Sequence, residues 1–288
     1  MKRRKTLRDQ IYSFLALALV TIFLVFLLFP IYWMIITSFK TPDDAMSTTP
    51  KFIPFVDFIP SLHTWIDIIF GYRYGDTVKA LFNSVVIASV SATLTVALGS
   101  LAGYALSRFK YYKWKNRDIM GFIIAQRMMP PIVALVPLYY MFSQLNLLDT
   151  QLAIILIHTA FNLPLTTWIL KDFFDSLPIE VEEAAMIDGA KYDILLARIV
   201  LPLIKPGIFA TWIFSFILSW NEFLMVLGIA YNNAITLTWL VSTGHHVRAL
   251  EWWTISAYGT LAIVPPILFA AVLQKFVVKG LTFGAVKG

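Results

Sequence analysis

Long apolar runs, separated by short polar segments, follow one another along almost the whole chain. Six of these runs hold about 20 or more mostly apolar residues, the length with which a helix crosses a bilayer. The pattern predicts an all-α integral membrane protein with six transmembrane helices in a single transmembrane domain over residues 1–288. The expected helices cover approximately residues 11–39, 78–106, 119–144, 152–170, 203–229 and 253–278.

The first run follows a basic N-terminus, Met1-Lys2-Arg3-Arg4-Lys5. A secretory signal peptide has a shorter apolar core, of about 7–15 residues, followed by a small-residue cleavage site. The run over residues 11–36 is longer, and no such site follows it. We therefore expect an uncleaved first transmembrane helix.

Composition and the placement of charge agree with a membrane protein. Hydrophobic residues make up 59% of the chain and charged residues 14%, whereas soluble domains carry about 25% charged residues. Of the 23 Lys and Arg residues, 17 lie at the N-terminus, after the second and fourth runs, and in the C-terminal tail. Because cytoplasmic segments collect Lys and Arg, we expect both termini in the cytoplasm and no nucleic acid as a partner. With no cysteine, the chain has no disulfide, thiolate catalyst or Cys-ligated metal.

The segment over about residues 41–77 lies on the external side in this topology. Its four prolines disfavour a long regular helix, and its aromatic residues suit a membrane interface. It is either a packed surface loop or a docking site for an external partner.

Small residues recur along the second run. They allow helices to approach one another closely, so helix packing is favoured over a polar pore lining. The residues are Ser84, Ser89, Ser91, Thr93, Thr95, Gly99, Ser100 and Gly103.

The polar segment between the fourth and fifth runs, about residues 175–202, predicts two short helical pieces joined by a sharp turn. Pro178 suits the first turn of a helix, and the helix dipole favours the three carboxylates that follow it. Gly189 can take a positive φ and turn the chain, and a second amphipathic piece covers residues 192–200. Such a unit is either an ordinary polar loop or a rigid element that fills a groove of another protein.

This segment also carries a spaced motif. It reads Glu183-Ala184-Ala185, three residues, Gly189, nine residues, Ile199, one residue and then Leu201-Pro202. The spacing resembles the loop by which permease subunits of ABC-type importers contact their ATPases.

Other segments resemble the same family, specifically the smaller, maltose-permease-like, six-span subunits of carbohydrate importers. The resemblance implies a type I importer permease fold with a cytoplasmic coupling helix between spans four and five. It covers nearly the whole chain and is poor only in the external segment. The segments are Phe29-Pro30-Ile31-Tyr32-Trp33-Met34, Ser38-Phe39-Lys40, Asn83-Ser84, Gly103-Tyr104-Ala105-Leu106-Ser107-Arg108, Trp220-Asn221-Glu222-Phe223 and the tail from Gln274 to Gly288.

The resemblance also implies partners and a location. A second permease, two ATPase subunits and an external binding protein would form the importer with this chain in the bacterial inner membrane. ATP and Mg would bind the partner ATPases, and this chain would bind no cofactor. It has no Gly-x-x-x-x-Gly-Lys-Ser/Thr sequence and is expected to be non-catalytic. Within the C-terminal cytoplasmic tail, about residues 279–288, Gly280 to Gly288 is a second ATPase-contact candidate. The coupling residues implied by position are Glu183, Ala184, Ala185, Asp188, Gly189, Leu201 and Pro202.

One arginine lies within an apolar run, where a charge costs about 2.5–3.5 kcal/mol and usually faces a cavity or a partner. Arg127 precedes Pro130-Pro131, which interrupt the hydrogen-bond ladder of a helix. Broken helices at membrane depth commonly line cavities, so we expect Arg127 near the translocation path. An intersubunit ion pair, or a helix-end position that reaches the lipid headgroups, is the alternative.

Four further polar residues lie within apolar runs and are candidates for the path. Asn221 and Glu222 are in the fifth run, where Glu222 either binds substrate or forms a buried pair with Arg127 or a partner permease. His158 and Asn162 are in the fourth run, where a helix–helix hydrogen bond is the favoured role of His158.

Two other classes of function compete with a permease. A secondary transporter driven by an ion gradient predicts inverted repeats and several buried acids, whereas this chain has only Glu222 and no evident repeat. A membrane enzyme needs a nucleophile–base pair or a metal cluster. His245-His246 with Glu251 lacks helical spacing and a third ligand, so no metal site is expected. The predicted function is a permease that couples ATPase motion to alternating access for a sugar, polyol or sugar derivative, which can be anionic.

Overall fold

The structure is a computed structural model that describes residues 7–242, 245–246 and 249–284. It is nearly all helical, so the predicted all-α class is confirmed. The exception is a two-residue antiparallel hairpin, in which β1 (His245–His246) pairs with β2 (Ala249–Leu250).

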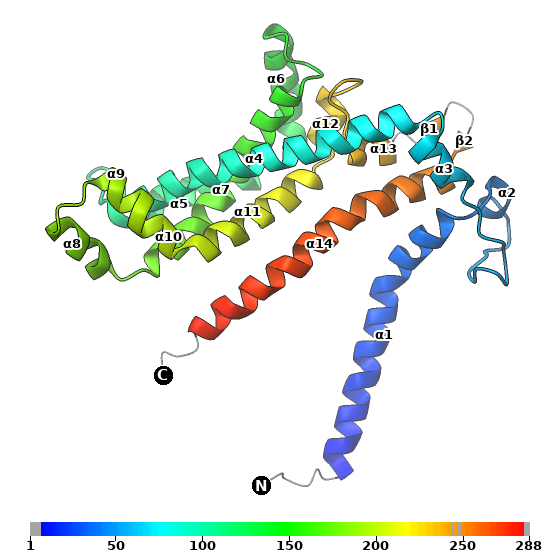
Figure 1. The fold of residues 1–288 in the computed structure, drawn as a ribbon, viewed down its shortest axis with the longest axis horizontal. Coiled ribbons are helices and arrows are strands. Elements are labelled where there is room, and N and C mark those ends of the chain that lie inside the picture. The colour runs from blue at the N-terminus through cyan, green and yellow to red at the C-terminus, as the bar shows by residue number, and fades with distance from the viewer. Residues whose placement is uncertain (1–6, 243–244, 247–248, 285–288) are drawn as a thin grey trace. The chain divides into compact units, whose positions relative to one another are not determined.

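Four long apolar helices match four of the predicted runs. They are α1 (Leu7–Thr37), α4 (Tyr74–Arg108), α7 (Gln151–Asp175) and α14 (Trp252–Gly284) (Figure 1). Within the described part of the chain, these four have the length and composition to cross a membrane alone. Two sharply bent helix pairs raise the number to six if each pair is one span.

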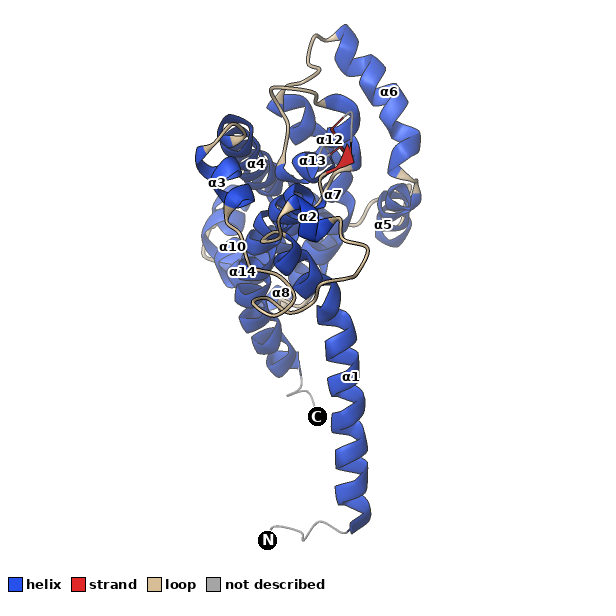
Figure 2. Cartoon of the chain, turned by 90° about the vertical axis from the view of Figure 1, so that its right-hand side faces the viewer, coloured by secondary structure: helices blue, strands red, loops and turns tan. Residues whose placement is uncertain are grey.

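The third predicted run is one of the bent pairs. It consists of α5 (Asn116–Ala125), a short 3₁₀ turn, η1 (Gln126–Met128), and α6 (Pro131–Gln144). The two arms are bent by 87°, and α6 runs away from α5 in Figure 2. The bend lies at Pro130-Pro131, where neither residue has a backbone N–H to continue the ladder. The break expected from the double proline is therefore present.

The fifth predicted run, residues 203–229, is not one helix, and that expectation was wrong. α11 (Lys205–Trp220) ends at Asn221, and α12 (Leu224–Ile229) begins three residues later. The cause is local, because the Glu222 carboxylate accepts the backbone N–H of Met225 at 3.0 and 3.2 Å. A side-chain acceptor at this position stabilises the start of a new helix.

The described chain divides into two compact units. The first holds the described residues up to 74 and between 241 and 261, and the second holds residues 75–240 and 262–284. In the first, the segment over 41–77 has only two short helices before α4, α2 (Pro42–Ala45) and α3 (His63–Phe70), as its prolines predict. The segment is bound to the end of α1, since Trp65 Nε1 donates to Ser38 Oγ at 3.2 Å.

The second unit is built on close contact between α4 and α7. A Cβ atom added to Gly103 would lie 3.0 Å from the Lys171 nitrogen and 3.1 Å from the Thr167 oxygen. Gly99 approaches the Thr166 side chain in the same way, and Ser91 and Ser100 are buried. The interpretation of the small residues as a packing surface is therefore confirmed.

The short elements of the second unit lie at its two ends (Figure 1). At one end are α8 (Ile179–Ile187), α9 (Tyr192–Ile194), a π-type turn, η2 (Leu195–Val200), and α10 (Leu201–Leu203). At the other end are α6 and α12, followed in the chain by α13 (Leu237–Ser242).

Candidate functional site: a helix–glycine–helix loop and a polar cavity

The loop between α7 and α11 contains the turn expected at Gly189. Gly189 has φ +90°, a conformation that glycine adopts without a steric penalty. Its N–H donates to the Met186 oxygen at 3.0 Å, and the Ala190 N–H donates to the Ala185 oxygen at 3.0 Å. These two bonds form a Schellman motif that ends α8. The chain therefore leaves α8 in a fixed direction.

The predicted coupling residues on α8 and after it lie mostly at the surface. Glu183, Ala184, Asp188 and Gly189 are exposed, and Ala185 is half-buried against the apolar cluster around Phe174. The neighbouring Ile187 has 86% of its surface exposed. α8 therefore offers a thin, partly apolar face to its surroundings in the isolated chain.

Glu182, one residue before Glu183, faces the opposite way and is buried. It forms an ion pair with Arg108 at the end of α4, at 2.7 Å, and accepts the Tyr104 hydroxyl at 2.8 Å. We call Tyr104, Arg108 and Glu182 the α4–α8 node. Arg108 also donates to the Phe174 and Leu177 oxygens at 2.9 and 3.3 Å, so that the node connects α8, α4 and the end of α7.

The node was not predicted from the sequence. In the sequence, Glu182 is one of the three carboxylates that follow Pro178, and Arg108 is one of the 17 basic residues expected on the cytoplasmic side. The signal that separates Glu182 from Glu183 is the helical period, which places adjacent residues about 100° apart on a helix.

The second helical piece of the loop is anchored to α7. Leu195 and Val200 of the π-type turn are fully buried in the cluster that contains Leu170 and Phe174. Leu201 is half-buried and Pro202 is exposed. The chain then bends by 78° into α11, so the loop is packed on the helices that it connects.

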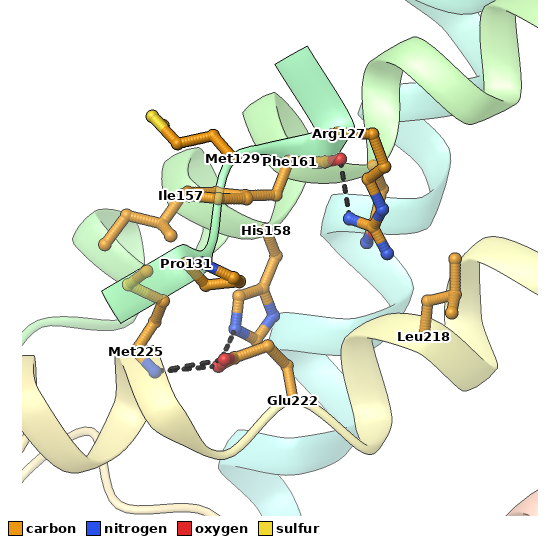
Figure 3. Close-up of a pocket in the computed structure, with 10 residues that line it drawn as sticks. Arg127, Met129, Pro131, Ile157, His158, Phe161, Leu218, Glu222 and Met225 are labelled. Carbon is orange, nitrogen blue, oxygen red and sulfur yellow. Dashed lines mark hydrogen bonds and ion pairs between the residues drawn. The ribbon is translucent and has the colours of Figure 1, made fainter. Parts of the chain in front are cut away.

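A cavity with four polar side chains in a mostly apolar lining lies where the two broken helices meet α7 (Figure 3). Its volume is about 220 Å³, and it brings together four of the five residues predicted for the translocation path. The fifth, Asn221, is exposed at the end of α11 and does not line it. The lining residues are Arg127, Met129, Pro131, Ile157, His158, Phe161, Asn162, Leu218, Glu222 and Met225.

His158 and Glu222 form a hydrogen-bonded pair on one wall. His158 Nδ1 lies 2.6 Å from Ser219 Oγ, and Nε2 lies 3.2 Å from Glu222 Oε2. Its side chain is 1% exposed. The expected helix–helix hydrogen bond of His158 is therefore present, between α7 and the start of the break after α11.

Arg127 faces the cavity from η1, on another wall (Figure 3). Nη1 donates to the Phe161 oxygen at 2.9 Å. No carboxylate of the described residues lies within 4.0 Å of its guanidinium, so Glu222 is not its ion-pair partner. Met129 and Phe161, together with Arg127, also border a second cavity of about 430 Å³.

The external residues considered for a metal site have other contacts. Glu251 accepts Arg73 Nη2 at 2.9 Å and the Thr254 hydroxyl at 2.8 Å. The side chains of His245 and His246 lie outside the described residues.

The structure has the features of a membrane subunit of a transport system. They are the long apolar helices, the broken span beside the cavity and the helix–glycine–helix loop. Residues 95–283 match the family "Binding-protein-dependent transport system inner membrane component", and the chain belongs to this family.

Curated relatives align over almost the full chain. The sulfoquinovosyl glycerol transport system permease protein SmoH of Agrobacterium fabrum is 36% identical, over 91% of this chain and 89% of its own. The trehalose/maltose transport system permease protein MalG of Thermococcus litoralis is 32% identical, over 91% of this chain and 92% of its own. A solved bacterial ABC transporter involved in alginate import has the same fold, with a TM-score of 0.74 at 20% identity, over 95% of this chain and 99% of that one.

These similarities confirm the resemblance found in the sequence. The chain is an ABC importer permease, a non-catalytic, multi-pass inner-membrane subunit, and ATP hydrolysis belongs to a separate subunit. An ion-gradient-driven secondary transporter is the less supported alternative.

Proposed function

We propose that this chain is one of two permeases of an ATP-driven importer for a sugar or sugar derivative. The support is the cargo named for its relatives, which includes sulfoquinovosyl glycerol, trehalose and maltose, and diacetylchitobiose. In the proposed complex, two ATPases carry ATP and Mg, and an external binding protein delivers the sugar. A solved alginate transporter of this fold was crystallised with its periplasmic protein.

The proposed orientation places both termini and the α8 loop in the cytoplasm, with six spans between. It is supported by the Lys and Arg distribution. The bent pair α5–α6 serves as the third span, and α11, which follows the 78° bend after α10, supplies the fifth.

The observation that carries the mechanism is the construction of α8. Its exposed face holds Glu183 and Ala184, and its buried face holds Glu182, bound to Arg108. An ATPase cleft that binds the exposed face would move α8 together with α4 and α7, because the ion pair and hydrogen bonds of the node connect these three helices. The resulting shift opens the path alternately to each side. Coupling of this kind requires contacts that differ between the two states.

Co-purification from native membranes tests this proposal. A tagged chain, solubilised in mild detergent, is expected to bring ATPase subunits and a second permease. Glu183→Lys combined with Gly189→Pro should lose the ATPases, because the charge on the gripping face is reversed and the φ of +90° is closed to proline. Gly75→Ala is the matched control, since a Cβ at Gly75 meets nothing within 4 Å.

The outcomes separate the two transport classes. ATPases recovered with the natural chain and the Gly75 control, but lost from the double variant, support the importer and the coupling role of α8. A chain that purifies alone under conditions that preserve known complexes would contradict the importer. ATPases retained by the double variant would contradict the coupling role alone.

A further inference from the structure

The cavity contains a cation whose charge is not neutralised by the described residues. Arg127 lines the cavity, is exposed in the isolated chain and has five N–H donors. The structure gives it one partner, the uncharged Phe161 oxygen at 2.9 Å. A guanidinium within an apolar run needs an anion or a wet cavity beside it.

Glu222, the acid of the same cavity, is engaged elsewhere. Its Oε2 faces His158 Nε2 at 3.2 Å, and both of its oxygens accept the Met225 N–H. Moving the carboxylate to Arg127 would release the start of α12 and leave the buried His158 Nε2 without its carboxylate partner. The fold therefore holds the two charges of the cavity on separate walls.

Asn162 provides a second unused polar group. It is 5% exposed and lines the same cavity, and its side chain makes no hydrogen bond with the described residues. A buried amide is normally hydrogen-bonded. Asn162 is one turn from His158 on α7 and lies on the same helix face. Its amide can therefore form a hydrogen bond with a ligand in the cavity.

From these positions we infer that the cavity binds an anionic group of the cargo, a carboxylate, sulfonate or phosphate carried on a sugar. Arg127 pairs with the anion, and Asn162 supplies a further hydrogen bond. Glu222 accepts from the sugar hydroxyls with the lone pairs that His158 and Met225 leave. The inference rests on the proposed sugar importer and narrows its substrate class.

Uptake by the complete importer tests the inference. The importer, with its second permease, ATPases and binding protein, is reconstituted in proteoliposomes and given ATP inside. The probes are D-glucose, D-glucuronate, glucose 6-phosphate and 6-deoxy-6-sulfoglucose, and their D-galactose counterparts, each radiolabelled. At least one anionic member is expected to enter in an ATP-dependent manner.

Variants of Arg127 assign the selectivity to the cavity. Arg127→Gln should lower uptake of the anionic probe about tenfold or more, the effect of losing a hydrogen bond between charged groups. Uptake of the anionic probe by Arg127→Lys should lie between that of the natural chain and that of Arg127→Gln. Lysine keeps the positive charge but cannot form two parallel hydrogen bonds to one anion. Arg117→Gln is the matched control, since Arg117 is exposed on α5 and does not line this cavity.

Three results would overturn the inference. ATP-dependent uptake of uncharged probes alone would contradict it while leaving the importer function intact. Equal loss of charged and uncharged uptake in Arg127→Gln, together with loss of the second permease on purification, would show that Arg127 pairs with an acid of that partner. ATP-independent uptake, or none for any probe, would overturn the sugar importer and the inference together.

Discussion

The second compact unit contains two sites in which an arginine and a glutamate occur together, and they are arranged in opposite ways. In the α4–α8 node, Arg108 and Glu182 are 2.7 Å apart, with side chains 11% and 5% exposed. In the cavity, Arg127 and Glu222 line one space but bind a backbone oxygen and a histidine instead. A pair with both charges satisfied holds helices together. Charges kept apart remain available to a ligand.

The largest effect is expected from breaking the node. Glu182→Ala leaves the Arg108 guanidinium buried without its carboxylate, which costs about 3–5 kcal/mol. Thermal unfolding of the detergent-solubilised protein should shift down, and α8 should become sensitive to protease. Replacing both residues, Arg108→Met with Glu182→Leu, should cost much less because no charge is left unpaired. Equal destabilisation by the single and double changes would contradict the pairing.

Asp149 is a third carboxylate of the second unit, and it differs from Glu182 and Glu222 because its hydrogen bonds come from backbone N–H groups alone. It is 3% exposed and accepts N–H groups from all four residues of the segment 231–234, at 2.8–3.1 Å. Asp149→Asn should destabilise this segment by about 1–3 kcal/mol. Faster amide exchange confined to residues 231–234 would show it. Unchanged exchange there would contradict the anchoring role.

The same carboxylate gives a pH dependence with a definite sign. Burial raises the pKa of Asp149, but the backbone N–H groups of residues 231–234 outweigh burial and hold the pKa below its ordinary value. A folded-state pKa below the unfolded one stabilises the fold fully above about pH 4. The stabilisation is lost as the pH falls further, through the lowered pKa. Amide hydrogen exchange of residues 231–234 should therefore become faster only below about pH 4. In Asp149→Asn, the exchange of these residues should follow only the pH dependence of the intrinsic exchange rate.

A smaller change tests whether the cavity charges are kept apart by His158. His158→Ala removes one donor from Glu222 and frees the carboxylate to approach Arg127. Uptake of the anionic probe should fall about threefold to tenfold, equivalent to about 1 kcal/mol. Ser219→Ala is the control, because Ser219 contacts His158 Nδ1 and leaves the bond to Glu222 in place. Equal losses in both variants would point to general damage of the helix contact.

The smallest effect is expected from a pair in the same unit that is more open to solvent. Lys171 and Asp175 on α7 are four residues apart, and the carboxylate is 42% exposed. Such pairs contribute about 0.3–0.5 kcal/mol, so Lys171→Ala should shift the unfolding temperature barely measurably. A loss comparable to that of Glu182→Ala would show that exposure does not distinguish these pairs.

Most of the fold could be predicted from the sequence because bilayer-length apolar runs and prolines have direct structural consequences. α1, α4, α7 and α14 match their runs within several residues, and the break before α6 follows from Pro130-Pro131. The break between α11 and α12 could not be predicted, since it coincides with a bond from the Met225 N–H to the Glu222 side chain, which precedes the first residue of α12 by two positions.

The site was predictable in its members but not in its pairings. Five polar residues were predicted for the path because polar groups are costly in apolar runs. The structure brings four of them to one cavity and leaves Asn221 exposed outside it. The partners of each charged side chain depend on how the helices are rotated and on contacts between residues far apart in the sequence. For the same reason, the bond between Glu182 and Arg108, 74 residues apart, left no local signal.

The 87° bend of α5 against α6 also bears on how the chain enters the membrane during synthesis. The two arms have 10 and 14 residues, whereas a helix that inserts on its own needs about 20. Neither arm can be released into lipid alone, because its unpaired backbone groups at the break would face hydrocarbon. The neighbouring α7 offers a contact at the break, because its Phe161 oxygen accepts Arg127 Nη1. We therefore expect the third and fourth apolar runs to leave the translocon together.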